Sequence, residues 1–153
     1  MGKVVRLQKV NIDATGAAKL ESSGLTVEQG AELGMYTVAN AQTLDAQFNA
    51  EPALVLPYFD IDGRPMRAHK AWPDFYRIRY LGEPKHDFAA ASGGKASRYS
   101  QPRNTGVCAY FPGLVDWKGL AADATEPVLI TEGELKAAKA TAEGFPTIGL
   151  GGV

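Results

Sequence analysis

The pattern of apolar and polar positions is clearest near the carboxyl end of the chain, between residues 127 and 152. Val128–Ile130 is a short aliphatic run, which predicts a strand buried on both faces of a sheet. Glu134–Glu143 consists almost entirely of good helix formers, and Gly144 is placed to end that helix. Thr147–Leu150 predicts a second short buried strand. We therefore expect a βαβ unit with two parallel strands and a right-handed crossover.

A hairpin is predicted in the middle of the chain. Ala53–Phe59 is apolar and strand-like, and Pro57 favours an edge or a bulge for it. Asp60–Gly63 has the composition of a tight turn, because aspartates bond to nearby backbone and glycine allows a positive φ. A return strand is expected over Arg64–Ala68.

The next predicted strand, Phe75–Leu81, alternates strictly. Tyrosines and an isoleucine share one face, and Arg77 and Arg79 share the other, which we expect to be exposed. Two guanidinium groups on one exposed face are suited to phosphate contacts, although a plain solvated face explains the same alternation.

The amino-terminal part predicts little sheet. Residues 1–23 suggest a flexible arm or an edge strand, with a connector from residue 11. Thr26–Gln29 has the form of a capping box, followed by a short helix that Gly34 ends. Ala39–Phe48 predicts a second helix. These helices are expected to cover one end of the sheet, and the alternative is a docking module.

Composition limits the function classes. The chain of 153 residues has 45% hydrophobic residues and one cysteine, Cys108, so it forms no internal disulfide and no cysteine-rich zinc site of its own. Its longest apolar runs are far shorter than a membrane span, and no secretory signal pattern begins it, so we expect a cytosolic protein.

Charge is distributed unevenly. Residues 64–103 contain nine basic and three acidic residues, whereas the remainder contains seven basic and fourteen acidic residues. Such a basic region attracts nucleic-acid phosphate. Within it, residues 91–106 predict a surface loop carrying Lys95, Arg98 and Arg103, with Tyr99 able to stack on a base. The loop lacks the spacing of an ATP-binding P-loop.

The strongest candidate for chemistry is Glu132, at the carboxyl end of the first strand of the βαβ unit. Open α/β sheets bind ligands at that edge, and a carboxylate followed by glycine is suited to holding Mg²⁺ near a phosphate. From spacing alone, an acid that complements the dipole of the following helix is the commoner explanation.

The residues Ile130-Thr131-Glu132-Gly133-Glu134, with Lys136-Ala137 and Ile148-Gly149-Leu150-Gly151-Gly152, resemble the first motif of the Toprim domain of primases, phage primase-helicases and topoisomerases. The likeness is greatest to Toprim-like domains of phage and plasmid replication proteins. It implies that Glu132 is the catalytic acid and that Glu132 and Glu134 hold Mg²⁺ or Mn²⁺. Nucleic-acid or nucleotide contacts are implied for Arg77, Arg79, Lys95, Arg98, Arg103 and Lys136.

The family's later Asp-x-Asp does not occur before Val153, so we expect an amino-terminal portion of a longer protein. The fold class expected is α/β (α+β). Four regions are expected: a flexible arm or edge strand over residues 1–23, a helical segment over 24–50, a basic β-rich subdomain over 51–117 and the start of a Toprim-like domain over 118–153.

The resemblance implies a Mg²⁺-dependent, primase-like nucleotidyltransferase region that acts on a single-stranded DNA template and nucleotides in the bacterial host cytosol. Catalysis would require further chain or a partner, such as a helicase domain or subunit. Two alternatives remain: a non-catalytic nucleic-acid-binding Toprim-like module, and an interaction domain that recruits a helicase through Thr26–Phe48.

Overall fold

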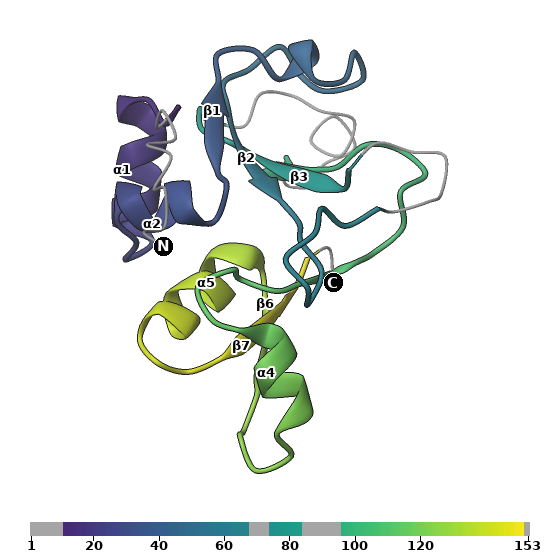
Figure 1. Ribbon diagram of the computed structural model, residues 1–153. Coiled ribbons are helices and arrows are strands. Elements are labelled where there is room, and N and C mark those ends of the chain that lie inside the picture. The colour runs from purple at the N-terminus through teal and green to yellow at the C-terminus, as the bar shows by residue number, and fades with distance from the viewer. Residues whose placement is uncertain (1–10, 68–73, 84–95, 152–153) are drawn as a thin grey trace, which may run out of the picture.

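The computed structural model describes residues 11–67, 74–83 and 96–151 and shows two sheets joined through helices (Figure 1). The first sheet is antiparallel, in the order β1-β2-β3-β4, and consists of Tyr36–Val38, Ala53–Pro57, Tyr76–Tyr80 and Tyr99–Ser100. The second has the order β5-β7-β6, formed by Ala109–Tyr110, Thr147–Leu150 and Leu129–Glu132. The helices are α1 (Ala14–Ser22), α2 (Val27–Glu32), the 3-10 turn η1 (Ala41–Thr43), α4 (Trp117–Ala122) and α5 (Glu134–Ala142).

The predicted βαβ unit is confirmed. Strands β6 and β7 are parallel, with Ile130 opposite Ile148, and α5 connects them. Gly133 adopts a φ of 87° between β6 and α5, and its N–H donates to the carbonyl of Leu150, which holds the start of α5 at the end of β7. Gly144 ends α5 with a φ of 94°.

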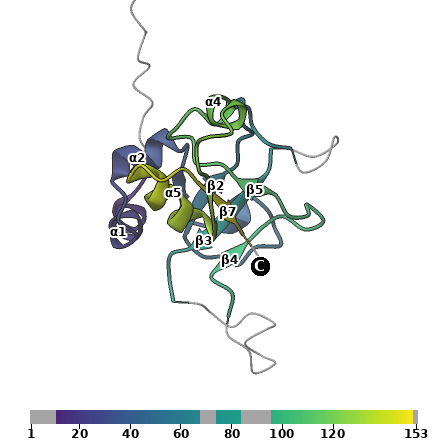
Figure 2. The ribbon, with the colours of Figure 1, turned by 90° about the horizontal axis from the view of Figure 1, so that it is seen from below.

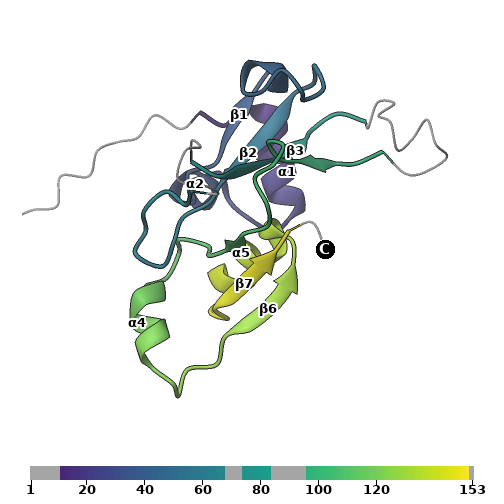
Figure 3. The same cartoon turned by 90° about the vertical axis from the view of Figure 1, so that its right-hand side faces the viewer.

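The prediction that the first strand of this unit is buried on both faces is wrong. A Cβ added at Gly149 would lie 3.1 Å from Cβ of Ala137, so odd positions of β7 face α5 and even positions face away. Ile130, opposite Ile148, therefore lies on the uncovered face and is 68% exposed. Strand β6 is also at the edge of its sheet, and Leu129 is 50% exposed. Figure 3 shows α5 behind β6 and β7, whose near face is open.

The first sheet is covered on both faces. Leu54 and Leu56 of β2 belong to the main core with residues of α1 and α5 and with the leucines on either side of α2, whereas Val55 belongs to a second cluster with Ile78. The predicted alternation of β3 is confirmed, but its arginine face is not exposed: Arg77 and Arg79 are each 8% exposed. They lie opposite Leu56 and Leu54, on the face of the sheet that packs against α1 and α5. Figure 2 shows both helices beside this sheet.

The amino-terminal predictions are partly wrong. Residues 11–23 are not a connector but contain α1, capped by the Asp13 side chain, which accepts from the Gly16 N–H. The capping box is confirmed: the Thr26 hydroxyl accepts from the N–H of Gln29, and the Gln29 side chain accepts from the N–H of Thr26. Gly34 follows α2 with a φ of 75°.

The helix predicted over Ala39–Phe48 does not form, and only η1 is helical there. The Asn40 side chain accepts from the N–H of Gln42, and the Asp45 side chain accepts from the N–H of Gln47. Such local side-chain bonds compete with helical backbone bonds. The segment instead places Phe48 in the second cluster against the first sheet.

The turn at Asp60–Gly63 is confirmed, because the Asp60 side chain accepts from the N–H groups of Asp62 and Arg64, and Gly63 has a φ of 76°. In the described residues the return strand is reduced to two isolated bridges, between Phe59 and Pro65 and between Arg67 and Asp74. Proline has no N–H to extend a ladder.

The edge position that Pro57 favoured for the strand over Ala53–Phe59 is wrong. Strand β2 is not an edge strand, since it pairs with both β1 and β3, and Pro57 is its last residue, beyond the stretch that β1 pairs. The chain between β5 and β6 contains α4, whose Trp117 is buried and donates its indole N–H to the Pro112 carbonyl. None of the helices in the described ranges is long and apolar enough to cross a membrane.

Candidate functional site

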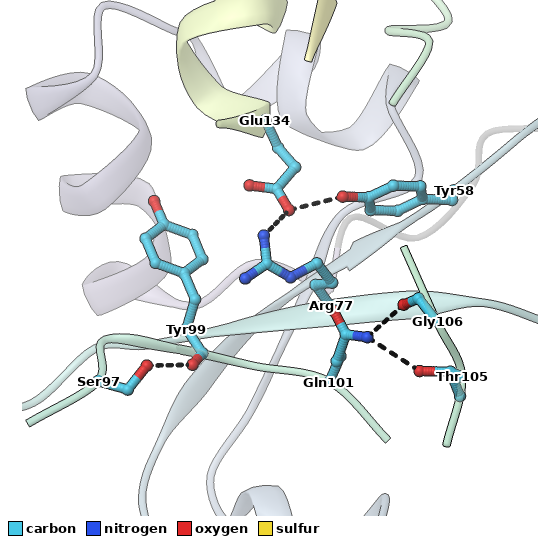
Figure 4. Close-up of polar contacts among 8 residues, drawn as sticks. All are labelled: Tyr58, Arg77, Ser97, Tyr99, Gln101, Thr105, Gly106 and Glu134. Carbon is cyan, nitrogen blue, oxygen red and sulfur yellow. Dashed lines mark hydrogen bonds and ion pairs between the residues drawn. The ribbon is translucent and has the colours of Figure 1, made fainter. Parts of the chain in front are cut away.

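The two sheets meet at a buried ion pair. Arg77 of β3 donates from Nη1 to Oε1 of Glu134 over 2.7 Å, and the Tyr58 hydroxyl donates to the same oxygen over 2.7 Å (Figure 4). The side chains of Arg77 and Glu134 are 10% and 1% exposed. Because Glu134 is the first residue of α5, this contact joins the βαβ unit to the first sheet.

A glycine makes room for the pair. A Cβ on Gly151 would lie 2.0 Å from Nη1 of Arg77 and 2.8 Å from Oε1 of Glu134. Real Cβ atoms do not approach other atoms so closely, so any side chain at 151 would have to displace the pair. The lack of a side chain at Gly151 thus allows Arg77 of β3 to approach the end of the βαβ unit closely.

The ion pair keeps unused hydrogen-bonding capacity. Within the described part of the chain, Oε2 of Glu134, Nε of Arg77 and the hydroxyl of Tyr110 are buried without a hydrogen-bond partner. Burial raises the pKa of Tyr58, and the negative charge of Glu134 raises it further, so Tyr58 stays a neutral donor. Burial likewise raises the pKa of Tyr110.

A cavity of about 290 Å³ opens beside this pair, and we call it the Glu132 cleft. Glu132 is exposed at the end of β6, and Lys136 is exposed in the first turn of α5. The structure therefore brings four of the predicted site residues together: Arg77, Glu132, Glu134 and Lys136. The lining includes Arg77, Tyr99, Glu132, Glu134, Lys136 and Gly151.

Tyr99 forms one wall of the cleft. Its ring centroid lies 5.4 Å from Cζ of Arg77 and 5.4 Å from Cζ of Arg79, within the range of cation–π attraction. Arg79 also donates from Nη1 to the carbonyl of Tyr80. Among the described residues, Arg79 has no carboxylate within ion-pair distance, so its charge is compensated only by these weaker contacts.

The other predicted cations contribute nothing to the described lining of the Glu132 cleft. Arg98 and Arg103 are exposed, and neither lines the Glu132 cleft. Arg98 is close enough to Lys19 to lower its pKa. Lys95 lies outside the described residues.

Two cations near this site were missed in the sequence, Lys19 of α1 and Lys139 of α5. They line a second cavity of about 440 Å³, which we call the lysine pocket, together with Ser23, Tyr99, Leu135, Lys136 and Ala140. Lys139 follows Lys136 by three residues on a predicted helix, a spacing that places both on one side and could have indicated it. No signal indicated Lys19, because residues 11–23 were expected to be a connector.

The described residues do not by themselves form a magnesium site. Three or more His, Cys, Asp or Glu side chains at metal-holding distance do not occur in the described ranges. One oxygen of Glu134 already accepts from Arg77 and Tyr58, so Glu134 serves the buried pair, and Glu132 is left as the exposed carboxylate of the cleft. Mg²⁺ normally needs several oxygen ligands. Glu132 would therefore need oxygen ligands from elsewhere to hold Mg²⁺.

Comparisons of the chain with protein-family models, with curated proteins and with solved structures found no match. A functional assignment therefore depends on the cleft and its residues.

Proposed function

We propose that this chain is a nucleic-acid-binding, Toprim-like region of a phage or plasmid replication protein, in which the Glu132 cleft binds a phosphate of single-stranded DNA. The observation that carries this proposal is the lining of one cleft by Arg77 and Lys136 next to the acid at the carboxyl end of β6. Ligands of open α/β sheets bind at that edge.

The geometry of Arg77 favours phosphate as the ligand. Glu134 takes one terminal nitrogen of the guanidinium, which fixes its orientation, and the other terminal nitrogen lies on the side of Tyr99 (Figure 4). A pre-oriented guanidinium loses little entropy when it binds an oxyanion. Lys136 adds a flexible ammonium on the opposite element of the same cleft.

The charge around the cleft favours an anion as well. Arg79 is buried without a carboxylate among the described residues, and Lys19, Lys136 and Lys139 lie along the adjoining cavity. Like charges gathered this closely repel one another, and a bound phosphate relieves that repulsion.

The experiment measures the affinity for a fluorescent single-stranded oligodeoxythymidylate by anisotropy over a series of salt concentrations. Lys136→Gln should weaken binding about three- to tenfold and lower the salt slope by about 0.7, the share of one phosphate contact on a single strand. Lys118→Gln is the matched control, since Lys118 is exposed and pairs with Asp62 away from the cleft. Equal affinities for both variants and the unmodified chain would overturn the proposal.

A second candidate function, primase-like nucleotidyl transfer with Mg²⁺, is favoured by the exposure of Glu132 within the same cleft. It requires further carboxylates, from chain beyond these residues or from a partner. Glu132→Gln should abolish Mg²⁺-dependent primer synthesis by the complete replication protein. The same change should strengthen DNA binding about twofold or more, since it removes a negative charge beside the phosphate. Primer synthesis that persists in the variant would leave the non-catalytic module as the function.

A further inference from the structure

The lysine pocket and the Glu132 cleft are neighbours on one surface of the molecule. Both are lined by Tyr99, Leu135 and Lys136, so a ligand can pass from one to the other without leaving the protein surface. The lysine pocket is built where α1 meets α5. The side chain of Lys139 runs closely past Gly24, where a Cβ would lie 2.8 Å from its Cε.

The two cavities differ in charge. Two carboxylates, Glu132 and Glu134, line the first, whereas the described lining of the lysine pocket contains three lysines and no acid. Glu143 contacts Lys139 from outside the lining. The pKa of Lys19 is lowered by its burial and by the nearby charges of Arg79 and Arg98, so positive charges gather at this end of the surface.

The pocket is also apolar. Leu135, Ala140 and the ring of Tyr99 form its walls between the ammonium groups. A bare inorganic anion would leave these walls unused, whereas a nucleotide offers a phosphate for the lysines and a flat base for the apolar walls.

We infer that the lysine pocket binds a second nucleotide of the same DNA single strand, with its phosphate at Lys19 and Lys139 and its base against Tyr99 and Ala140. This inference rests on the proposed function and adds a direction to it. The strand crosses from the Glu132 cleft over Lys136 towards α1. Duplex DNA does not fit this arrangement, because its bases are stacked inside the helix and are not free to enter a pocket.

Two variants test the pocket with the same fluorescent oligodeoxythymidylate. Ala140→Glu places a carboxylate among the lysines and Ala140→Gln places a neutral side chain of the same size there, so their difference isolates charge. We expect Ala140→Glu to weaken binding about tenfold and Ala140→Gln about twofold. Lys19→Met keeps the apolar stem and removes the charge, and it should weaken binding about threefold with a salt slope lower by about 0.7.

A second probe separates base from phosphate. An oligomer of equal length with abasic sugars carries the same phosphates, and the unmodified chain should bind it about threefold or more weakly. The Ala140→Glu variant should show a smaller difference between the two oligomers. Equal binding of both oligomers by the unmodified chain would overturn the inference.

The outcomes also distinguish this inference from the proposed function. If Lys136→Gln weakens binding but Lys19→Met and Ala140→Glu do not, the lysine pocket is not a nucleotide site and the Glu132 cleft remains one. If all three leave binding unchanged, both proposals are wrong. Circular dichroism of each variant checks that it is folded, and Lys19→Met decides the matter if Ala140→Glu does not fold.

Discussion

The two sheets of this molecule differ in which side chains they bury: the first buries charged side chains, and the second exposes an apolar one. In the first sheet, β3 buries the charged side chains Arg77 and Arg79, each 8% exposed. In the second sheet, β6 leaves Ile130 68% exposed. The position of a side chain relative to solvent is thus set by what lies against its face of the sheet, and polarity alone does not decide it.

The cause differs for each sheet. Helix α5 brings Glu134 to the arginine face of β3, so a buried charge finds a partner 2.7 Å away. The same helix covers only one face of β6 and β7, and within the described residues no other element covers Ile130. One helix therefore explains both the buried ion pair and the side of the second sheet that is covered.

The largest effect is expected when the buried pair is broken. Glu134→Ala leaves Arg77 with an uncompensated buried charge and should lower the free energy of unfolding by about 3–5 kcal/mol, measured by urea denaturation. Glu132→Ala, two residues away and exposed, should change it by about 0.5 kcal/mol or less. Similar losses for the two variants would contradict the comparison between the sheets.

Truncating one isoleucine in β3 and one in β6 allows a direct comparison of the two strands. Ile78→Ala in β3 removes a fully buried side chain and should cost about 2–5 kcal/mol of unfolding free energy. Ile130→Ala in β6 should cost about 0.5 kcal/mol or less, because that side chain is already exposed to water. A large cost at Ile130 would mean that its face of the sheet is covered in solution.

Gly151→Ala tests the geometry of the ion pair without changing any charge. The added Cβ must displace Arg77, so stability should fall by about 1–3 kcal/mol. Affinity for single-stranded DNA should fall with it, since Arg77 would lose its orientation in the Glu132 cleft. Unfolding by urea and anisotropy of the same preparations measure the two effects, and unchanged affinity would remove Arg77 from the binding surface.

The smallest effect at neutral pH is expected for Tyr110→Phe. The Tyr110 hydroxyl is buried without a hydrogen-bond partner in the described residues, so its removal should leave stability unchanged or raise it by about 1 kcal/mol.

Alkaline pH should enlarge this difference. The pKa of buried Tyr110 is raised above its ordinary 10.0, so above pH 10 the unfolded chain releases the Tyr110 proton while the folded chain keeps it. Stability of the unmodified chain should therefore be full below pH 10 and fall as the pH rises, and Tyr110→Phe should reduce that fall by about 1.4 kcal/mol per pH unit. Urea denaturation at pH 8 and pH 11 measures the difference. Parallel losses for both chains would show that Tyr110 titrates normally.

Most of the local structure could be predicted. The βαβ unit, the capping box at Thr26 and the turn at Asp60 depend on neighbours within a few residues, and each was confirmed. Helix α1 was missed because Gly16 and the serines that follow resemble a connector. Gly16 is in fact buried, where an added Cβ would lie 2.2 Å from Cγ2 of Thr37, so its small size serves packing.

The candidate site could be predicted only in part. Glu132 follows from the βαβ pattern and Lys136 from the resemblance of the motif that contains it, and the structure places both in one cleft with Arg77. The roles of Glu134 and Lys19 could not be predicted, because their partners are distant in sequence: Glu134 binds Arg77, 57 residues earlier, and Lys19 lies across the lysine pocket from α5.

The sequence by itself determined the βαβ unit, the capping box at Thr26 and the turn at Asp60, since these depend on backbone preferences and on side chains that bond to their own neighbourhood. It also determined that β3 has an arginine face. Only the tertiary structure decided that this face is buried and that the apolar face of β6 is not. The physical reason is that α5 packs against both sheets, and which faces one helix covers depends on contacts between residues far apart in the chain.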